Sequence, residues 1–91
     1  MSRIEIYTSP WCGFCYRAKA MLADKGLDFD EIDVTGPPEH RRAMVDRSGR
    51  SSVPQIFIDG APIGGADELA RLYASGALDR LRDTGDATTT G

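Results

Sequence analysis

Residues 8–17 read Thr-Ser-Pro-Trp-Cys-Gly-Phe-Cys-Tyr-Arg and hold both cysteines of the chain, Cys12 and Cys15. A short apolar strand pattern at 4–7 precedes this stretch, and a helical pattern at 15–25 follows it. Cys12 is therefore predicted to lie where a strand ends and a helix begins. Free N–H groups and the helix dipole at such a place favour the thiolate, the form of cysteine that attacks disulfides. Cys15, on the next turn, is predicted to be close enough to form a disulfide with Cys12.

Length and composition predict one soluble globular domain. The chain has 91 residues, of which 41% are hydrophobic and 27% charged, and the net charge is -3. Without a basic block, nucleic-acid binding has little electrostatic support. The apolar runs are too short to cross a bilayer, and residues 1–5 lack the apolar stretch of a secretory signal. We therefore expect a cytoplasmic protein with no membrane partner, in which a Cys-x-x-Cys pair is catalytic or metal-binding and not structural.

The rest of the chain alternates strand and helix patterns. Strands are predicted at 29–34, 53–58 and 61–64, and helices at 36–49 and 67–75, with a further helical turn at Leu78 and Leu81. Asp59-Gly60 is a preferred hairpin turn, and Pro62 places the strand after it at a sheet edge. The order β-α-β-α-β-β-α predicts an α/β fold, with a parallel βαβ unit joined to an antiparallel hairpin in a four-stranded mixed sheet with helices on both faces.

Three motifs stand in order along the chain: Cys12-Gly13-Phe14-Cys15, Ser52-Val53-Pro54-Gln55, and Gly-Gly-Ala-Asp-Glu-Leu at 64–69. With these motifs the chain resembles the glutaredoxins, specifically the small bacterial dithiol type, over residues 3–82. The resemblance implies the thioredoxin-like fold, a glutaredoxin domain at 1–83 and a flexible tail at 84–91. It also implies glutathione as electron donor and a cis Pro54 that faces the cysteines.

The resemblance implies a thiol-disulfide oxidoreductase that reduces protein disulfides and glutathione mixed disulfides. Cys12 would be the nucleophile and Cys15 the resolving thiol. Asp67 would accept from the ammonium group of glutathione, and free N–H groups beside it would bind the γ-glutamyl carboxylate. The expected glutathione contacts are Phe14, Ser52, Val53, Pro54, Gly65, Ala66, Asp67 and, for the glycine carboxylate, Arg41.

Taken without the resemblance, several of these residues have structural interpretations. Cys15 could be a small core residue, and Pro54 a proline at the start of a strand. The glycines at 64–65 could form a loop that enters a helix with Asp67 as its cap. The arginines at 41, 42, 47 and 50 fit a solvated helix face, and His40 fits the surface, since one histidine and one cysteine pair make a poor zinc site.

Two departures from the commonest glutaredoxin pattern leave other functions open. Gly13 stands where that pattern has proline, and in this family a smaller residue there is seen in members that assemble a [2Fe-2S] cluster. In that alternative Cys12 is a metal ligand, and a homodimer with two glutathiones holds the cluster; otherwise a monomer is expected. Ser9 stands where a lysine often helps to hold glutathione, and Trp11 is more typical of thioredoxin. A thioredoxin reductase is therefore the alternative electron source.

Overall fold

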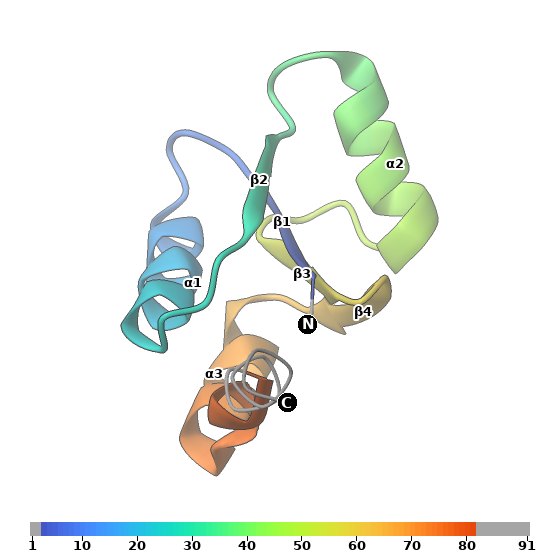
Figure 1. Cartoon of the computed structure of the whole chain (residues 1–91). Coiled ribbons are helices and arrows are strands. Elements are labelled where there is room, and N and C mark those ends of the chain that lie inside the picture. The colour runs from blue at the N-terminus through green and yellow to red at the C-terminus, as the bar shows by residue number, and fades with distance from the viewer. Residues whose placement is uncertain (1–2, 82–91) are drawn as a thin grey trace.

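The computed structural model describes residues 3–81, and their elements follow the predicted order (Figure 1). The strands are β1 (Ile4–Thr8), β2 (Asp30–Asp33), β3 (Gln55–Ile58) and β4 (Ala61–Gly64). The helices are α1 (Gly13–Asp24), α2 (Pro38–Ser48) and α3 (Ala66–Ser75), and residues 77–81 form a further helical turn. No helix in this part of the chain is long and apolar enough to span a membrane. The tail predicted at 84–91 lies outside the described residues.

The four strands form one mixed sheet in the order β2-β1-β3-β4. β1 and β2 are parallel, whereas β1 with β3 and β3 with β4 are antiparallel. The hairpin between β3 and β4 turns at Asp59 and Gly60, whose φ angles of 52° and 84° fit a type I′ turn. Pro62 lies on the edge strand β4, as expected for a residue without a backbone N–H. The predicted mixed sheet is therefore confirmed.

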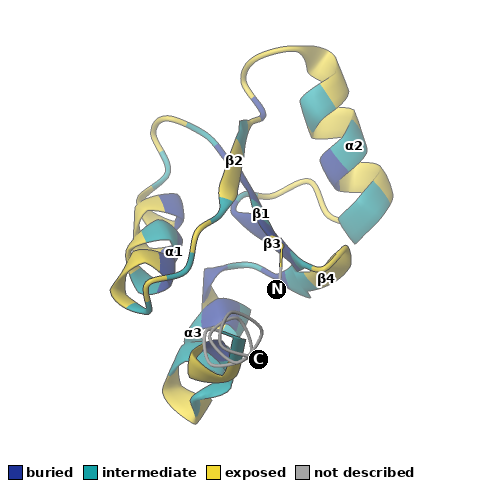
Figure 2. Cartoon of the chain, viewed as in Figure 1, coloured by how far each residue is buried: buried dark blue, intermediate teal, exposed yellow. Residues whose placement is uncertain are grey.

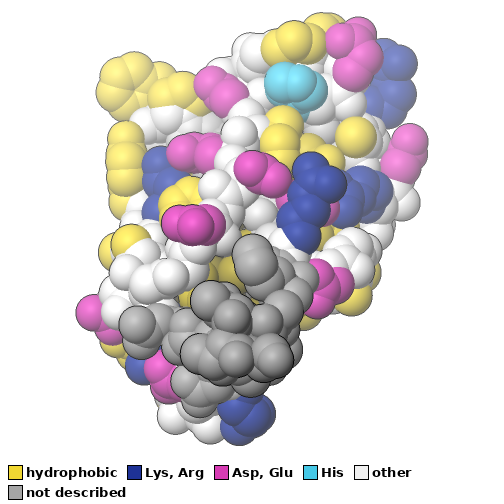
Figure 3. All heavy atoms as spheres, viewed as in Figure 1, with side chains coloured by type: hydrophobic (Ala, Val, Ile, Leu, Met, Phe, Trp, Pro, Cys, Tyr) yellow, Lys and Arg dark blue, Asp and Glu magenta, His cyan; other side chains and the backbone are white. Residues whose placement is uncertain are grey.

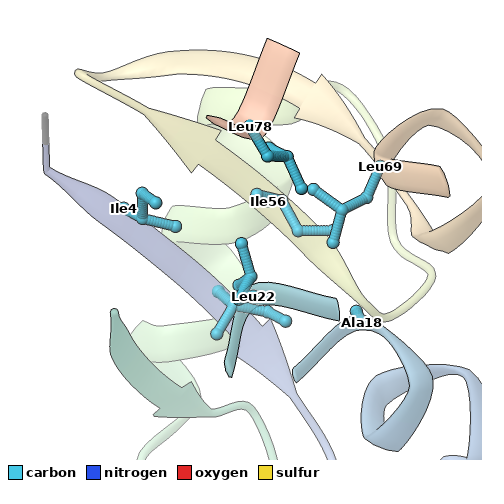
Figure 4. Close-up of a cluster of buried hydrophobic side chains, with 7 residues drawn as sticks. Ile4, Ala18, Leu22, Ile56, Leu69 and Leu78 are labelled. Atoms are coloured by element: carbon cyan, nitrogen blue, oxygen red, sulfur yellow. The ribbon is translucent and has the colours of Figure 1, made fainter. Parts of the chain in front are cut away.

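Helices α1 and α3 pack against one face of the sheet. Side chains alternate between the two faces along a strand, so Ile4 and Ile6 of β1 point to this face together with Ile56 of β3. Figure 4 shows side chains from the two strands and the helices pointing toward one another in this cluster. The helical members are Ala18, Leu22, Leu69 and Leu78. The contact holds the start of α1 and the start of α3 on the same face of the sheet.

Helix α2 covers the opposite face. Figure 2 shows a buried segment within α2, coloured dark blue. Met44 of this helix is fully buried and packs with Tyr7 of β1 and Phe57 of β3. Val45, the next residue of the helix, is turned about 100° away from Met44 and is 37% exposed. The buried stripe of α2 is therefore narrow.

Arg47 ties the last turn of α2 to the sheet. Its guanidinium donates to both carboxylate oxygens of Glu5, at 2.9 and 3.3 Å, and to the hydroxyl of Tyr7 at 3.0 Å. It also lies 4.0 Å from the ring centre of Phe57, and the bonds from Arg47 hold the pKa of Glu5 below its ordinary value. The solvated-face interpretation is therefore wrong for this arginine. The anchored helix end leads into the loop that carries Val53 and Pro54.

Candidate active site

Cys12 is the N-cap of α1, at the junction between a strand and a helix that the sequence predicted. Its Sγ accepts the backbone N–H of Cys15 at 3.1 Å and lies 3.7 Å from the carbonyl oxygen of Val53, to which the thiol donates. The donated N–H and the helix N-terminus both stabilise negative charge on this sulfur. Because Cys12 is partly exposed and Cys15 is buried, Cys12 is the thiol that a substrate can reach.

Cys15 lies one turn along α1 and is 1% exposed. Burial, with the hydrogen bond to Cys12 as the next cause, raises the pKa of the Cys15 thiol to about 12. Cys15 therefore stays protonated at neutral pH while Cys12 is free. Lys19 acts in the opposite direction on Cys15, and it is held by Glu31 at 2.9 Å. When Cys12 enters a disulfide, its contribution to the raised pKa of Cys15 disappears. Cys15 then ionises more easily than it does beside a free Cys12 thiol.

The loop between α2 and β3 faces Cys12. Its Val53–Pro54 peptide bond is cis, which confirms the expectation drawn from the resemblance. The buried side chain of Gln55 holds this loop, because its Nε2 donates to the carbonyl of Ser52 at 3.0 Å and to the hydroxyl of Ser52 at 3.4 Å. The Oε1 atom of Gln55 is buried and has no hydrogen-bond partner among residues 3–81.

The start of α3 forms the other wall of the site. Gly65 is the N-cap, and its N–H donates to the carboxylate of Glu68 at 2.6 Å, which holds the pKa of Glu68 below its ordinary value. The alternative with Asp67 as cap is wrong: Asp67 lies inside the first turn. Gly64 has a φ of 120°, and a Cβ there would collide with the Glu68 side chain. A Cβ on Gly65 would lie 3.3 Å from the carbonyl oxygen of Pro54, so the two walls meet at close range.

These walls enclose a pocket of about 240 Å³ beside Cys12. Its lining residues are Phe14, Arg50, Ser52, Val53, Pro54, Gln55, Gly65, Ala66, Asp67 and Glu68. Every glutathione contact that the resemblance implied, except Arg41, is in this set. The pocket thus lies between a cysteine at the start of one helix and the N–H groups at the start of another.

The sequence profile of the glutaredoxin family matches residues 4–63. This chain belongs to the glutaredoxin family. It is 51% identical to Glutaredoxin 3 of Escherichia coli strain K12 over 81 residues, which is 89% of this chain and 98% of that protein. This level of identity to a glutaredoxin supports thiol-disulfide oxidoreductase activity, with Cys12 and Cys15 as a Cys-x-x-Cys pair of the kind that this chemistry uses.

Two solved glutaredoxin structures share the fold. The solution structure of glutaredoxin from Brucella melitensis is 51% identical, with a TM-score of 0.76, and the match covers 91% of this chain and 90% of that one. A crystal structure of the buckwheat glutaredoxin-glutathione complex is 25% identical, also with a TM-score of 0.76, and the match covers 85% and 73%. The thioredoxin-like fold predicted for this glutaredoxin is thus confirmed.

Arg41 lies outside the pocket of this glutaredoxin. Its guanidinium donates to the carbonyl of Ser51 at 2.9 Å, and Arg41 lines a different pocket, together with Val34 and with further residues of α2. The arginine that lines the pocket is Arg50, just beyond the end of α2. The sequence analysis chose Arg41 among the four arginines at 41, 42, 47 and 50, and it gave no site role to Gln55 or Glu68. The spacing of Glu68, three residues after Gly65, is that of a capping box and could have indicated its position.

Three large hydrophobic side chains close to Cys12 in the sequence are exposed on the surface of this glutaredoxin. Trp11 is 94% exposed, and Phe14 and Tyr16 are each 58% exposed. Figure 3 shows hydrophobic side chains gathered over the loop between β1 and α1 and the start of α1. The rim of the site can therefore contact apolar parts of a protein substrate.

Within residues 3–81, a single chain does not offer a set of side chains that could bind a metal ion. Residues 3–81 contain no group of three or more His, Cys, Asp and Glu side chains that could hold a metal ion. Cys15 is buried, so Cys12 is the one thiol that could ligate a cluster from outside. Nδ1 of His40 donates to the carbonyl oxygen of Asp33 at 2.9 Å. The residues of a single chain therefore do not fit a [2Fe-2S] cluster.

Proposed function

We propose that this protein reduces protein disulfides and glutathione mixed disulfides with glutathione as its electron donor. The observation that carries the proposal is the pocket beside Cys12. One wall is extended backbone at Val53 and Pro54, which suits a short peptide, and the other is the start of α3. Asp67 can accept from an ammonium group, and the first N–H groups of α3 can donate to a carboxylate. Glutathione carries both groups at its γ-glutamyl end.

The first step is a thiol-disulfide exchange at Cys12. Its thiolate attacks the glutathione sulfur of a glutathionylated protein, and a new S–S bond forms as the old one breaks. The protein leaves as a thiolate and takes a proton from solvent. A second glutathione thiolate then attacks the disulfide on Cys12, which returns Cys12 as a thiolate and releases glutathione disulfide.

With a protein disulfide as substrate, Cys15 takes the second step. Cys12 attacks one sulfur and forms a mixed disulfide with the protein. Cys15 loses its proton and attacks the Cys12 sulfur, so that the protein leaves as a dithiol and a Cys12–Cys15 disulfide remains. Two glutathiones then reduce that disulfide and become glutathione disulfide. Cys15 is buried beside the partly exposed Cys12, so a substrate reaches Cys12 first. This arrangement suits a mechanism in which Cys12 reacts before Cys15.

One further observation supports glutathione. The buckwheat relative of the same fold is described as a complex with glutathione. The proposal also places the reaction in the cytoplasm, because glutathione keeps thiols reduced in that compartment.

The test is a glutathione-coupled disulfide reduction assay on the wild type. We expect reduction of a glutathionylated peptide that depends on the glutathione concentration and that ends when glutathione is left out. Thioredoxin and thioredoxin reductase replace glutathione in the parallel reaction. Faster reduction there than with glutathione would overturn the proposed electron donor.

The [2Fe-2S] alternative requires two chains, each with Cys12 as ligand, and two external thiols. One observation favours it: Gly13 is exposed, and a Cβ at this position would meet nothing within 4 Å, so the surface beside Cys12 is open. The check is anaerobic reconstitution with iron, sulfide and glutathione, followed by a visible spectrum and a measurement of mass in solution. A colourless monomer after reconstitution rejects this alternative.

A further inference from the structure

Lys19 follows Cys15 by one turn of α1, away from the pocket. Residues four apart on a helix lie on the same face, with their Cβ atoms about 5–6 Å apart, so the Lys19 side chain leaves the helix beside that of Cys15. The side chain of Lys19 is 26% exposed, so solvent only partly screens its charge. Its positive charge acts to lower the pKa of the Cys15 thiol, against the effect of burial.

The ammonium group of Lys19 is held by contacts outside its own turn. Its Nζ donates to Oε2 of Glu31 on β2 at 2.9 Å and lies 4.9 Å from the ring centre of Tyr16. The same carboxylate oxygen accepts the hydroxyl of Thr8 at 2.7 Å, and Thr8 is buried at the end of β1. A free lysine side chain samples many rotamers, whereas these contacts restrict Lys19 to the space beside α1 and β2.

The surroundings of the Cys15 sulfur oppose a negative charge more than they favour it. Burial and the neighbouring Cys12 raise the pKa of this thiol. The N–H of Ser9, in the loop between β1 and α1, and the charge of Lys19 act to lower it. Glu31 on β2 is the carboxylate next to this group of residues, and because it is 40% exposed, solvent screens part of its charge. Lys19 is thus a side chain here whose charge favours a thiolate at Cys15.

We propose that Lys19 is a positioning residue for the second step of protein disulfide reduction, in which its charge stabilises the Cys15 sulfur as that sulfur attacks Cys12. Cys15 releases its proton to solvent, a Cys12–Cys15 bond forms, and the bond between Cys12 and the substrate sulfur breaks. The substrate leaves as a thiolate and takes a proton from solvent. The cysteine pair is oxidised as the substrate disulfide is reduced.

The inference rests on the proposed function, in which Cys15 is the resolving thiol for protein disulfides. It adds that one cation of α1 serves only this branch of the reaction. A glutathione mixed disulfide is resolved by a second glutathione, so its reduction does not need Lys19.

The experiment separates the two steps by rapid mixing of the reduced protein with an equal amount of dithiobis(nitrobenzoate), an aromatic disulfide whose thiolate is coloured on release. Attack by Cys12 releases the first thiolate, in a phase whose rate rises with concentration. Attack by Cys15 within the same chain releases the second, in a phase whose rate does not.

The variants are Lys19→Met, Lys19→Arg and Arg17→Met. Methionine keeps an unbranched side chain and removes the charge, whereas arginine keeps the charge. Arg17 is the matched control, because it is an exposed cation of α1 two residues after Cys15, which turns it about 200° away around the helix.

We expect Lys19→Met to slow the second phase about fivefold and to leave the first phase within about twofold of the wild type. Lys19→Arg should keep the second phase within about twofold, because a guanidinium carries the same charge and can also bind Glu31. Arg17→Met should leave both phases within about twofold. Reduction of a glutathionylated peptide by glutathione should be the same in all four proteins.

Four results would overturn the inference. Lys19→Met leaves the second phase unchanged, Lys19→Met slows both phases equally, Arg17→Met slows the second phase as much as Lys19→Met does, or Lys19→Arg is as slow as Lys19→Met. The mixing experiment contains no glutathione, so these results leave the proposed electron donor to the glutathione-coupled assay. If the wild type shows no second phase, Cys15 is not the resolving thiol, and that part of the proposed function fails together with this inference.

Discussion

The starts of α1 and α3 lie on the same face of the sheet and border the same pocket, but they are capped in different ways. At α1 the cap is Cys12, whose Sγ accepts the N–H of Cys15. At α3 the cap is Gly65, and the carboxylate of Glu68 bends back to its N–H. At α1 the atom that caps the helix is thus the sulfur of Cys12. The cap of α3 has no side chain and leaves its neighbours open to a ligand.

The difference shows how one physical property serves two purposes. Unpaired N–H groups at a helix start favour negative charge in both places. At α1 the group at this position is the Cys12 sulfur, which belongs to the protein. At α3 the first N–H is already occupied by Glu68, and the remaining ones face a pocket that also contains Asp67. The residue at each cap decides whether the helix activates a nucleophile or receives a ligand.

The largest effect is expected from Cys12→Ser, which separates capping from chemistry. Serine is a good N-cap, so the free energy of unfolding should change by less than about 1 kcal/mol. Reduction of both protein disulfides and glutathione mixed disulfides should fall to background, because the hydroxyl is not a nucleophile toward sulfur. Urea denaturation and the glutathione-coupled assay check the two parts. Residual activity near that of the wild type would remove Cys12 from the mechanism.

Cys15→Ala should separate the two substrate types. Reduction of a protein disulfide should fall on the order of 100-fold, since an outside thiol replaces one held in place. Reduction of a glutathionylated peptide should stay within about twofold, because a second glutathione resolves it.

The pH dependence gives an independent readout of Cys15. Burial raises the pKa of Cys15, and this cause remains when Cys12 is in a mixed disulfide, so the Cys15 thiolate becomes more abundant with each unit of pH in the neutral range. Protein disulfide reduction by the wild type should therefore rise more steeply between pH 6 and pH 9, as an approximate range, than glutathione mixed-disulfide reduction. Equal slopes would count against Cys15 as the resolving thiol.

Gly64→Ala should weaken the α3 cap. The φ of 120° is unfavourable for alanine, and the new Cβ would push the Glu68 carboxylate away from Gly65. We expect a loss of about 1–3 kcal/mol in the free energy of unfolding. Gly13→Ala is the matched control, because its Cβ would meet nothing within 4 Å. Alanine at position 13 should leave the free energy of unfolding unchanged or raise it by up to about 1 kcal/mol. Equal losses in the two variants would contradict the role given to Gly64.

The smallest effect is expected from Glu68→Gln, and it depends on pH. The N–H of Gly65 lowers the pKa of Glu68 from its ordinary value of 4.5. Its stabilising contribution is thus present above about pH 4.5 and is lost as the pH falls through the lowered folded value. The wild type should be more stable than Glu68→Gln at neutral pH, and the difference should shrink in acid. Unfolding curves from pH 7 to about pH 3 measure the difference in the free energy of unfolding between the wild type and Glu68→Gln. If this difference grows in acid, Glu68 does not stabilise the start of α3 as a carboxylate.

Local patterns predicted the elements well. The turn at Asp59-Gly60, the edge strand with Pro62 and the strand-to-helix position of Cys12 all follow from residue types at short range, and the structure confirms them. The boundaries moved by a few residues: α1 begins at Gly13, and β3 begins at Gln55 after the cis Pro54. Such shifts are expected because caps and tertiary contacts choose the last turn of a helix and the ends of a strand.

Local sequence patterns did not predict which side chains contact one another across the fold. Arg41 and Arg50 look alike in sequence, yet one contacts Ser51 on the outside and the other lines the pocket. Arg47 in turn is held by Glu5 and Tyr7 of β1. Which arginine meets which partner depends on how α2 is anchored across the sheet, and no local rule contains that information.

By itself, the sequence determined a one-domain α/β fold, a reactive cysteine at a helix start and the motifs of the glutaredoxin family. Those features depend on residues close together in the chain, where propensity, turn chemistry and spacing act directly. The tertiary structure alone decided that Cys15 is buried enough for a pKa of about 12, that Glu68 and not Asp67 satisfies the cap of α3, and that Arg50 is the pocket's cation. Desolvation and charge pairing depend on which surfaces meet after folding, and only the packed chain sets those distances.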